Sequence, residues 1–86
     1  MRNGPYFDAL AAPEQRAVMR YAEALEQLYP DLAEHVAAGP GNDRAVYVYA
    51  PFPTDEEQVI EMSETMSKIG LDLLLDTGVL IVLMPK

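Results

Sequence analysis

The side chains that could do chemistry are few, and they begin with a single histidine. His35 is the only His in the chain, with Asp31 and Glu34 close to it on one expected helical turn. An imidazole near carboxylates can act as a general base or bind a metal ion. Because the chain has no Cys and no second His to complete a ligand set, we interpret His35 as a solvated residue near a helix end, and we predict no metal site and no cofactor.

Nucleophilic catalysis has no better support. Ser63 and Ser67 have no base beside them, and the chain lacks the Gly-x-Ser-x-Gly turn that exposes a nucleophilic serine in many hydrolases. We therefore predict no catalytic residues and expect that the protein is not an enzyme.

Acidic residues are the most prominent polar feature. The chain carries 14 acidic and 6 basic residues, a formal charge of −8. The candidate partner-binding acidic surface lies at the start of an expected helix and consists of Asp55, Glu56, Glu57, Glu61 and Glu64. It is either a solvated face, favoured by the positive end of the helix dipole, a docking surface for a basic partner, or a mimic of nucleic-acid phosphates.

Length and composition limit the class of protein. The 86 residues, half of them apolar, fit one small domain spanning residues 1–86. The acidic balance disfavours binding to nucleic acid or to an anionic membrane surface. The longest apolar run, residues 79–84, is far shorter than the about 20 residues that a membrane span needs. Without a signal-peptide pattern in the first residues, we expect a cytoplasmic protein.

The elements that must position these residues can be read from periodicity. Apolar residues recur at helical spacing over residues 13–29, with Pro13 in the first turn. Pro30 interrupts this pattern, a further helical turn is expected over residues 31–38, and residues 39–43 read as a loop. Residues 44–50 alternate as a strand, with Val46 and Val48 on one side and Tyr47 and Tyr49 on the other.

The second half of the chain reads as a helix followed by a strand. Thr54 and Glu57 form a capping-box pattern, and the apolar residues that follow predict a helix to about residue 75, ended by Gly78. Residues 79–84 form a wholly apolar strand. We therefore predict an α/β (α+β) fold, with an N-terminal helix or helix pair followed by a βαβ unit, whose crossover is long enough for parallel strands.

Two strands alone leave one sheet face and at least one edge uncovered. The simplest cover is a second copy, so we expect that the small two-stranded sheet is completed by dimerisation, or by a protein partner. The alternative is that residues 6–10 fold over the open face. The candidate oligomer interface consists of Tyr47, Tyr49, Val79, Ile81 and Leu83.

The strand, the proline-containing turn, the acidic helix and the Gly78-Val79 start of the last strand resemble the C-terminal half of minimal nucleotidyltransferase domains, over residues 45–85. In that family, activity depends on a Gly-Ser turn and a paired-Asp metal motif. This chain has no Gly-Ser pair, and Asp43 stands alone near the first strand. Since two-metal chemistry needs at least two converging carboxylates, the resemblance implies a reduced relative that lacks the active site.

Three functional hypotheses follow. The first is a small, acidic, non-enzymatic protein-interaction domain that forms a homodimer, with a possible basic protein as a further partner. The second is an acidic inhibitor or nucleic-acid mimic of the phage or mobile-element type, as among anti-CRISPR proteins. The third is a catalytically inactive, nucleotidyltransferase-like remnant of the antitoxin type.

Overall fold

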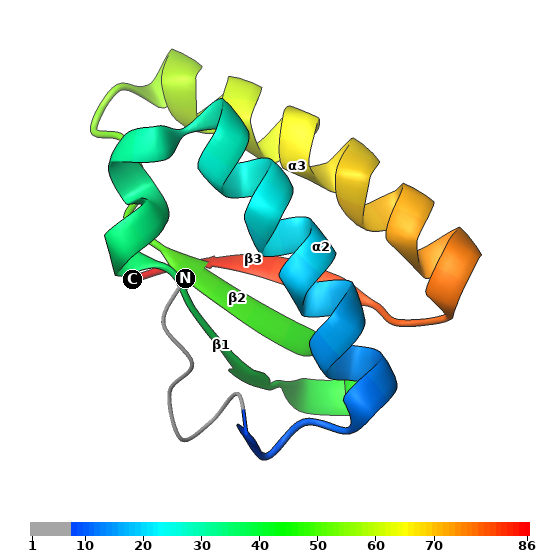
Figure 1. Cartoon of the computed structure of the whole chain (residues 1–86). Coiled ribbons are helices and arrows are strands. Elements are labelled where there is room, and N and C mark those ends of the chain that lie inside the picture. The colour runs from blue at the N-terminus through cyan, green and yellow to red at the C-terminus, as the bar shows by residue number, and fades with distance from the viewer. Residues whose placement is uncertain (1–7) are drawn as a thin grey trace.

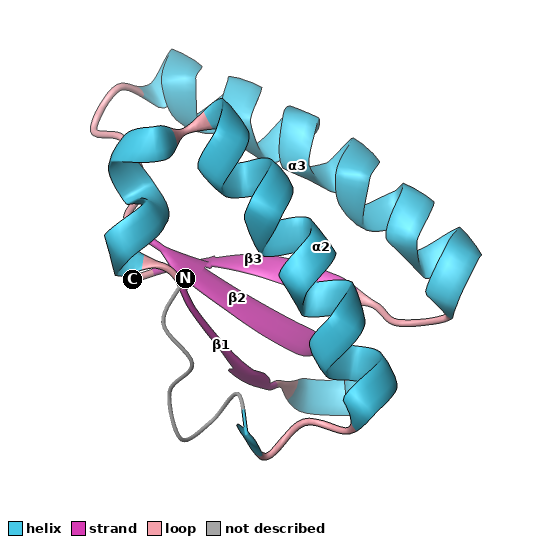
Figure 2. Cartoon of the chain, viewed as in Figure 1, coloured by secondary structure: helices cyan, strands magenta, loops and turns pink. Residues whose placement is uncertain are grey.

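The computed structural model describes residues 8–86, with the course of the backbone alone over residues 32–34. In chain order the elements are α2 (Ala12–Leu28), the 3-10 helix η1 (Pro30–His35), β1 (Ala37–Pro40), the 3-10 helix η2 (Asn42–Arg44), β2 (Val46–Ala50), α3 (Glu56–Thr77) and β3 (Ile81–Pro85). The strands form one sheet in the order β1-β2-β3. Figure 1 shows α2 and α3 on the same face of this sheet, and Figure 2 shows the resulting two layers.

The predicted fold class is confirmed, and so is the βαβ unit. The strand β2 pairs in parallel with β3, with Val46 opposite Ile81 and Val48 opposite Leu83. The crossover between them is α3. Its N-cap is Asp55, whose side chain accepts a hydrogen bond from the Glu57 backbone N–H at 3.0 Å. The predicted Thr54 cap was therefore wrong by one residue, because the Asp55 carboxylate reaches the free N–H groups of the first turn.

The first helix begins where its proline predicts. Pro13 lies in the first turn of α2, and the Glu14 carboxylate accepts a hydrogen bond from the Ala11 N–H at 3.0 Å. The helix ends at Leu28, before the Tyr29-Pro30 pair, because the residue preceding a proline is forced out of the helical region. Pro30 then opens η1, which ends before Val36. A predicted cover by residues 6–10 lies largely outside the described residues, although Leu10 is buried in the core.

The sheet has a strand that the sequence does not predict. Residues 37–40, expected as the end of a helical turn and a loop, form β1 and pair antiparallel with β2, so the predicted two-stranded sheet was wrong. Ala, Gly and Pro have little preference for strands, and the tyrosines of β2 supply the missing packing. Gly39 lies opposite Tyr47, and a Cβ added to Gly41 would lie 2.3 Å from the Tyr47 ring, so that ring covers the Gly41 backbone.

The core lies between the two helices and one face of the sheet. Met62 and Met66 of α3 are buried, as predicted, together with Val46 and Val48 of β2. The final strand is less enclosed than its apolar sequence predicts. Among residues 79–84, Val79 and Ile81 are buried, whereas residues 82–84 are only half-buried and Leu80 is exposed. The reason is that both helices lie on one face of the sheet (Figure 1), so residues 80, 82 and 84, which alternate with the buried Val79 and Ile81, point to the uncovered face. In addition, β3 is an edge strand, with a neighbour on one side only.

Candidate functional site: the free edge of β3

The outer edge of β3 carries backbone groups that point away from the sheet. Val46 N–H donates to the Leu80 carbonyl at 2.8 Å, and Lys86 N–H donates to the Ala50 carbonyl at 3.1 Å. In a parallel ladder these bonds fix which residues face the neighbouring strand. Even-numbered residues of β3 therefore bond to β2, and the N–H and C=O groups of Ile81 and Leu83 point outward. A free edge of this kind is a template for another strand.

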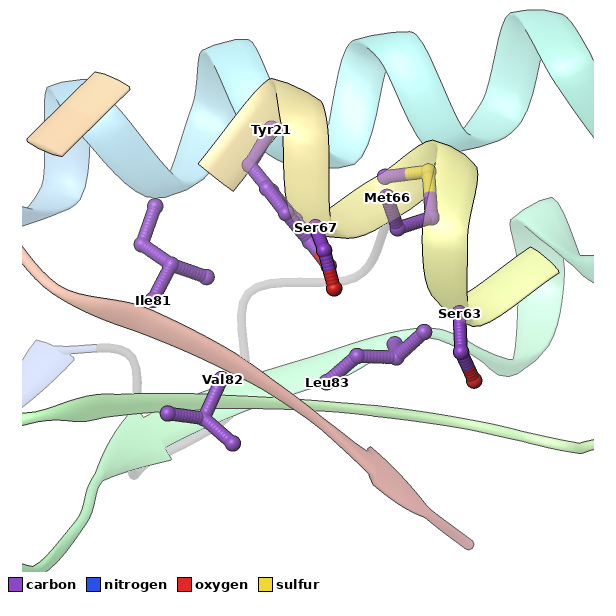
Figure 3. A pocket seen from close by; sticks show the side chains of 7 residues that line it. All are labelled: Tyr21, Ser63, Met66, Ser67, Ile81, Val82 and Leu83. Atoms are coloured by element: carbon purple, nitrogen blue, oxygen red, sulfur yellow. The ribbon is translucent and has the colours of Figure 1, made fainter. Parts of the chain in front are cut away.

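A hollow of about 260 Å³ lies beside this edge, under α3. Figure 3 shows the Ser63 and Ser67 side chains on its helical wall, with Tyr21 reaching down from α2 toward Ser67. The hollow is lined by Tyr21, Ser63, Met66, Ser67, Ile81, Val82 and Leu83. Its walls combine neutral hydroxyl groups with apolar side chains and strand backbone, and they carry no charge.

Tyr21 is the most buried polar side chain in this wall. Its ring is almost fully enclosed, and burial raises the pKa of its phenol above the ordinary value. Its hydroxyl has no hydrogen-bond partner among residues 8–86. In the same part of the chain, every side-chain oxygen that is fully shielded from solvent does have a partner. The hydroxyl must therefore reach the hollow, where water or an incoming polar group can bond to it.

Exposed apolar side chains gather on the same side of α3. Ile60 lies three residues before Ser63, and Leu71 lies four residues after Ser67, so both share the side of the helix that faces the hollow. Leu75 follows Leu71 by one further turn. These three residues, Ile60, Leu71 and Leu75, are here called the apolar stripe. Leu80 alternates with the buried Val79 and Ile81, so it faces the side of the sheet away from the helices. Of the six large apolar side chains that are exposed in the described part of the chain, three belong to the stripe, the others being Met19, Leu28 and Leu80.

The predicted oligomer interface divides between two sides of the sheet. Val79 and Ile81 are buried and Leu83 packs against the core, so these three lie under the helices and not on an accessible face. Tyr47 and Tyr49 lie on the opposite face, half-buried, with their rings in an edge-to-face contact at 6.2 Å. Val82 and Met84, which alternate with the buried residues of β3, and the apolar stripe are candidate interface residues that the sequence alone does not single out.

The candidate acidic surface wraps around the first turns of α3. All five carboxylates are exposed, and none is joined by an ion pair to a base in the stretch that the structure describes. Asp55 has a structural role as the helix cap. Glu61 lines a separate hollow with Tyr29 and Pro53, on the α2 side of the helix. Glu64 lies nearer to the apolar stripe, one turn after Ile60.

The residues considered for chemistry are not brought together. His35 is exposed at the end of η1, and its carbonyl accepts a hydrogen bond from Lys86 Nζ at 2.8 Å. Ser63 and Ser67 face the hollow without a nearby imidazole or carboxylate among its lining residues. Across residues 8–86 there is no group of three His, Asp or Glu side chains arranged to hold a metal ion, and no helix there is long and apolar enough to cross a membrane.

Comparison of the chain with protein-family models, with curated protein sequences and with solved structures found no match. The resemblance of residues 45–85 to minimal nucleotidyltransferases therefore stays a prediction. Among the surfaces of the described residues, the β3 edge and the apolar stripe of α3 combine unpaired backbone groups with exposed apolar side chains.

Proposed function

We propose that this protein is a small, non-enzymatic, cytoplasmic protein-interaction domain that associates with a second copy of itself. One observation carries the proposal: β3 is an edge strand with an unpaired side, and the helix that leads into it, α3, keeps the three side chains of the apolar stripe exposed. Soluble monomers rarely keep a large contiguous apolar patch exposed, and a sheet edge without protection tends to pair with another chain. Together they supply two kinds of interaction that stabilise a protein interface: the stripe offers apolar area, and the edge offers directional hydrogen bonds.

Part of the net charge of −8 lies away from this side of the molecule. Asp76 is held toward α2 by its ion pair with Arg20, with 2.7 Å between Asp76 Oδ2 and Arg20 Nη1. Glu61 also lies on the α2 side, beside Tyr29. Glu56, Glu57 and Glu64 lie within one turn of Ile60, and Lys68 follows Glu64 by one turn. The Leu71 and Leu75 end of the stripe is farther from these carboxylates, so two copies that meet there bring fewer of them together.

The test is sedimentation of the wild type and two variants. The wild type should sediment at about twice the chain mass of 9.5 kDa at micromolar concentration. Leu71→Glu removes two apolar side chains from each dimer, each worth about 1.5–3 kcal/mol when buried, so the dissociation constant should rise at least about 100-fold. Because Leu71 is 55% exposed in the single chain, its fold should be unaffected.

Met19→Glu is the matched control. Met19 is 52% exposed, and it lies on α2, which contacts α3, η1 and β2. The same change in charge and area at this position should leave the dimer intact. A wild type that stays monomeric up to high micromolar concentration, or equal effects of the two substitutions, would contradict self-association through this side.

A second candidate function is docking of a basic protein on the acidic surface. The supporting observation is that these five exposed carboxylates have no paired base in the described part of the chain. Screening by salt distinguishes the two functions. Raising the ionic strength should weaken capture of a basic partner, whereas it should leave self-association unchanged or strengthen it, because the repulsion between two acidic copies is reduced.

A further inference from the structure

The geometry of the β3 edge points to one specific pairing, and this inference rests on the proposed self-association. We infer that two copies join through β3, antiparallel and centred on Val82, so that two three-stranded sheets become one six-stranded sheet. The occupant of the edge is a second copy because the edge is self-complementary. Ile81 and Leu83 each offer an outward N–H and an outward C=O, and they lie symmetrically on either side of Val82.

Antiparallel pairing uses all of these groups. With Val82 opposite Val82 of the other copy, Ile81 of one copy lies opposite Leu83 of the other, and each such pair exchanges two backbone hydrogen bonds. The same contact brings Leu80 opposite Met84 across the two-fold axis. The exposed Leu80 side chain, which has no place in the single chain's core, then packs against an apolar neighbour.

Neighbouring registers are excluded by groups at the two ends of the strand. Centring the pair on Ile81 would require a bond from Val79 N–H, which already donates to Thr77 Oγ1 at 3.2 Å. Centring it on Leu83 would require a bond from residue 85, which is a proline and has no N–H. The register centred on Val82 needs neither group and leaves Pro85 beyond the paired residues.

The helices above the sheet agree with this arrangement. Ser67 lies over β3 near Val82, beside the small hollow (Figure 3). Around a two-fold axis at Val82 the two α3 helices run antiparallel, so the Ile60 end of one helix lies beside the end of the other that carries Leu71 and Leu75. The residues nearest the axis include Ser67 and Ser63, which are small enough to let the two helices approach.

Single cysteines test the register directly, since the chain has no Cys of its own. Residues 82 of the two copies form a non-hydrogen-bonded pair, with Cα atoms about 4.5 Å apart, within the range of about 4.4–6.8 Å that a disulfide spans. With diamide as the oxidant, which takes up the two electrons and two protons of the thiols, Val82→Cys should convert most of the protein into a covalent dimer.

Met84→Cys is the matched control, because it lies on the same strand and the same face. Residues 84 of the two copies are separated by about 13 Å along the strands and should not cross-link. A mixture of Leu80→Cys and Met84→Cys should instead give the mixed disulfide, which keeps the test valid if Val82→Cys folds poorly. Circular dichroism and sedimentation of the reduced variants check fold and association.

The two proposals fail in different ways. A wild type that sediments as a dimer while neither Val82→Cys nor the Leu80→Cys and Met84→Cys mixture cross-links would overturn the register and leave self-association standing. Cross-linking of Met84→Cys alone would also overturn it. A monomer at every concentration would overturn both proposals.

Discussion

Gly70 lies in the middle of α3, buried against β3, and an alanine at this position should stabilise the fold. The added Cβ would lie 3.5 Å from the Ile81 carbonyl oxygen and 3.7 Å from Tyr21 Cε2, which are ordinary contact distances. Exchanging an interior helical Gly for Ala gains about 0.8–1.0 kcal/mol of helix propensity, and burial of one methyl group adds up to about 0.8 kcal/mol. The free energy of unfolding should rise by about 1–2 kcal/mol, and Tm by at least about 4 °C.

Gly78→Ala is the matched control for this substitution. Nothing lies within 4 Å of a Cβ at Gly78, but its φ is +75°, so an alanine there is strained and should lower stability by about 1–2 kcal/mol. Both variants are compared with the wild type by thermal unfolding at one protein concentration, because the Tm of a protein that self-associates, as proposed here, depends on its concentration. A fall in Tm for Gly70→Ala would refute the reasoning and show that α3 and β3 leave no room for a methyl group.

Three further predictions concern the core, the hollow and the acidic surface. Ile81→Asp places an unpaired charge in the core and should remove several kcal/mol, most of the stability of a domain this small, as measured by urea unfolding; an equally stable variant would contradict the burial of this side chain. Burial raises the pKa of Tyr21 above its ordinary 10.0. The contribution of the protonated phenol to the free energy of unfolding is therefore complete below pH 10, and it is lost as the pH rises from there through the folded-state pKa. Tyr21→Phe should reduce this fall in the free energy of unfolding at alkaline pH. An unchanged pH dependence in the variant would contradict a raised pKa of Tyr21. Changing Glu61 and Glu64 to Gln should leave Tm unchanged or slightly raised if the surface is only solvated, whereas salt-dependent loss of capture of a basic protein would establish docking.

The helices and β2 could be predicted because their signals are local. Pro13 and Gly78 mark helix ends through backbone geometry that no distant contact alters. The alternation of Val and Tyr over residues 46–49 gives the buried and the half-buried face of β2 correctly. Met62 and Met66 lie in the core because their spacing matches the helical repeat.

The rest depends on which strands become neighbours, and this information is not local. The strand β1 consists of small residues and proline, and it is recognisable only once Tyr47 and Tyr49 lie beside it. Both helices cover the same face of the sheet (Figure 1), which is why the apolar sequence of residues 79–84 does not mean burial on both faces. The apolar stripe did have a signal, since Leu71 and Leu75 lie one turn apart and away from the core positions of α3.

Backbone amide exchange, followed residue by residue by NMR as the protein is diluted, tests the pairing of β3 most directly. The amides of Val82 and Met84 bond to β2 within each chain and should stay protected at every concentration. The amides of Ile81 and Leu83 should be protected at high concentration and exchange rapidly once the dimer dissociates. Ile81 and Leu83 amides that exchange rapidly at all concentrations would contradict association through the β3 edge.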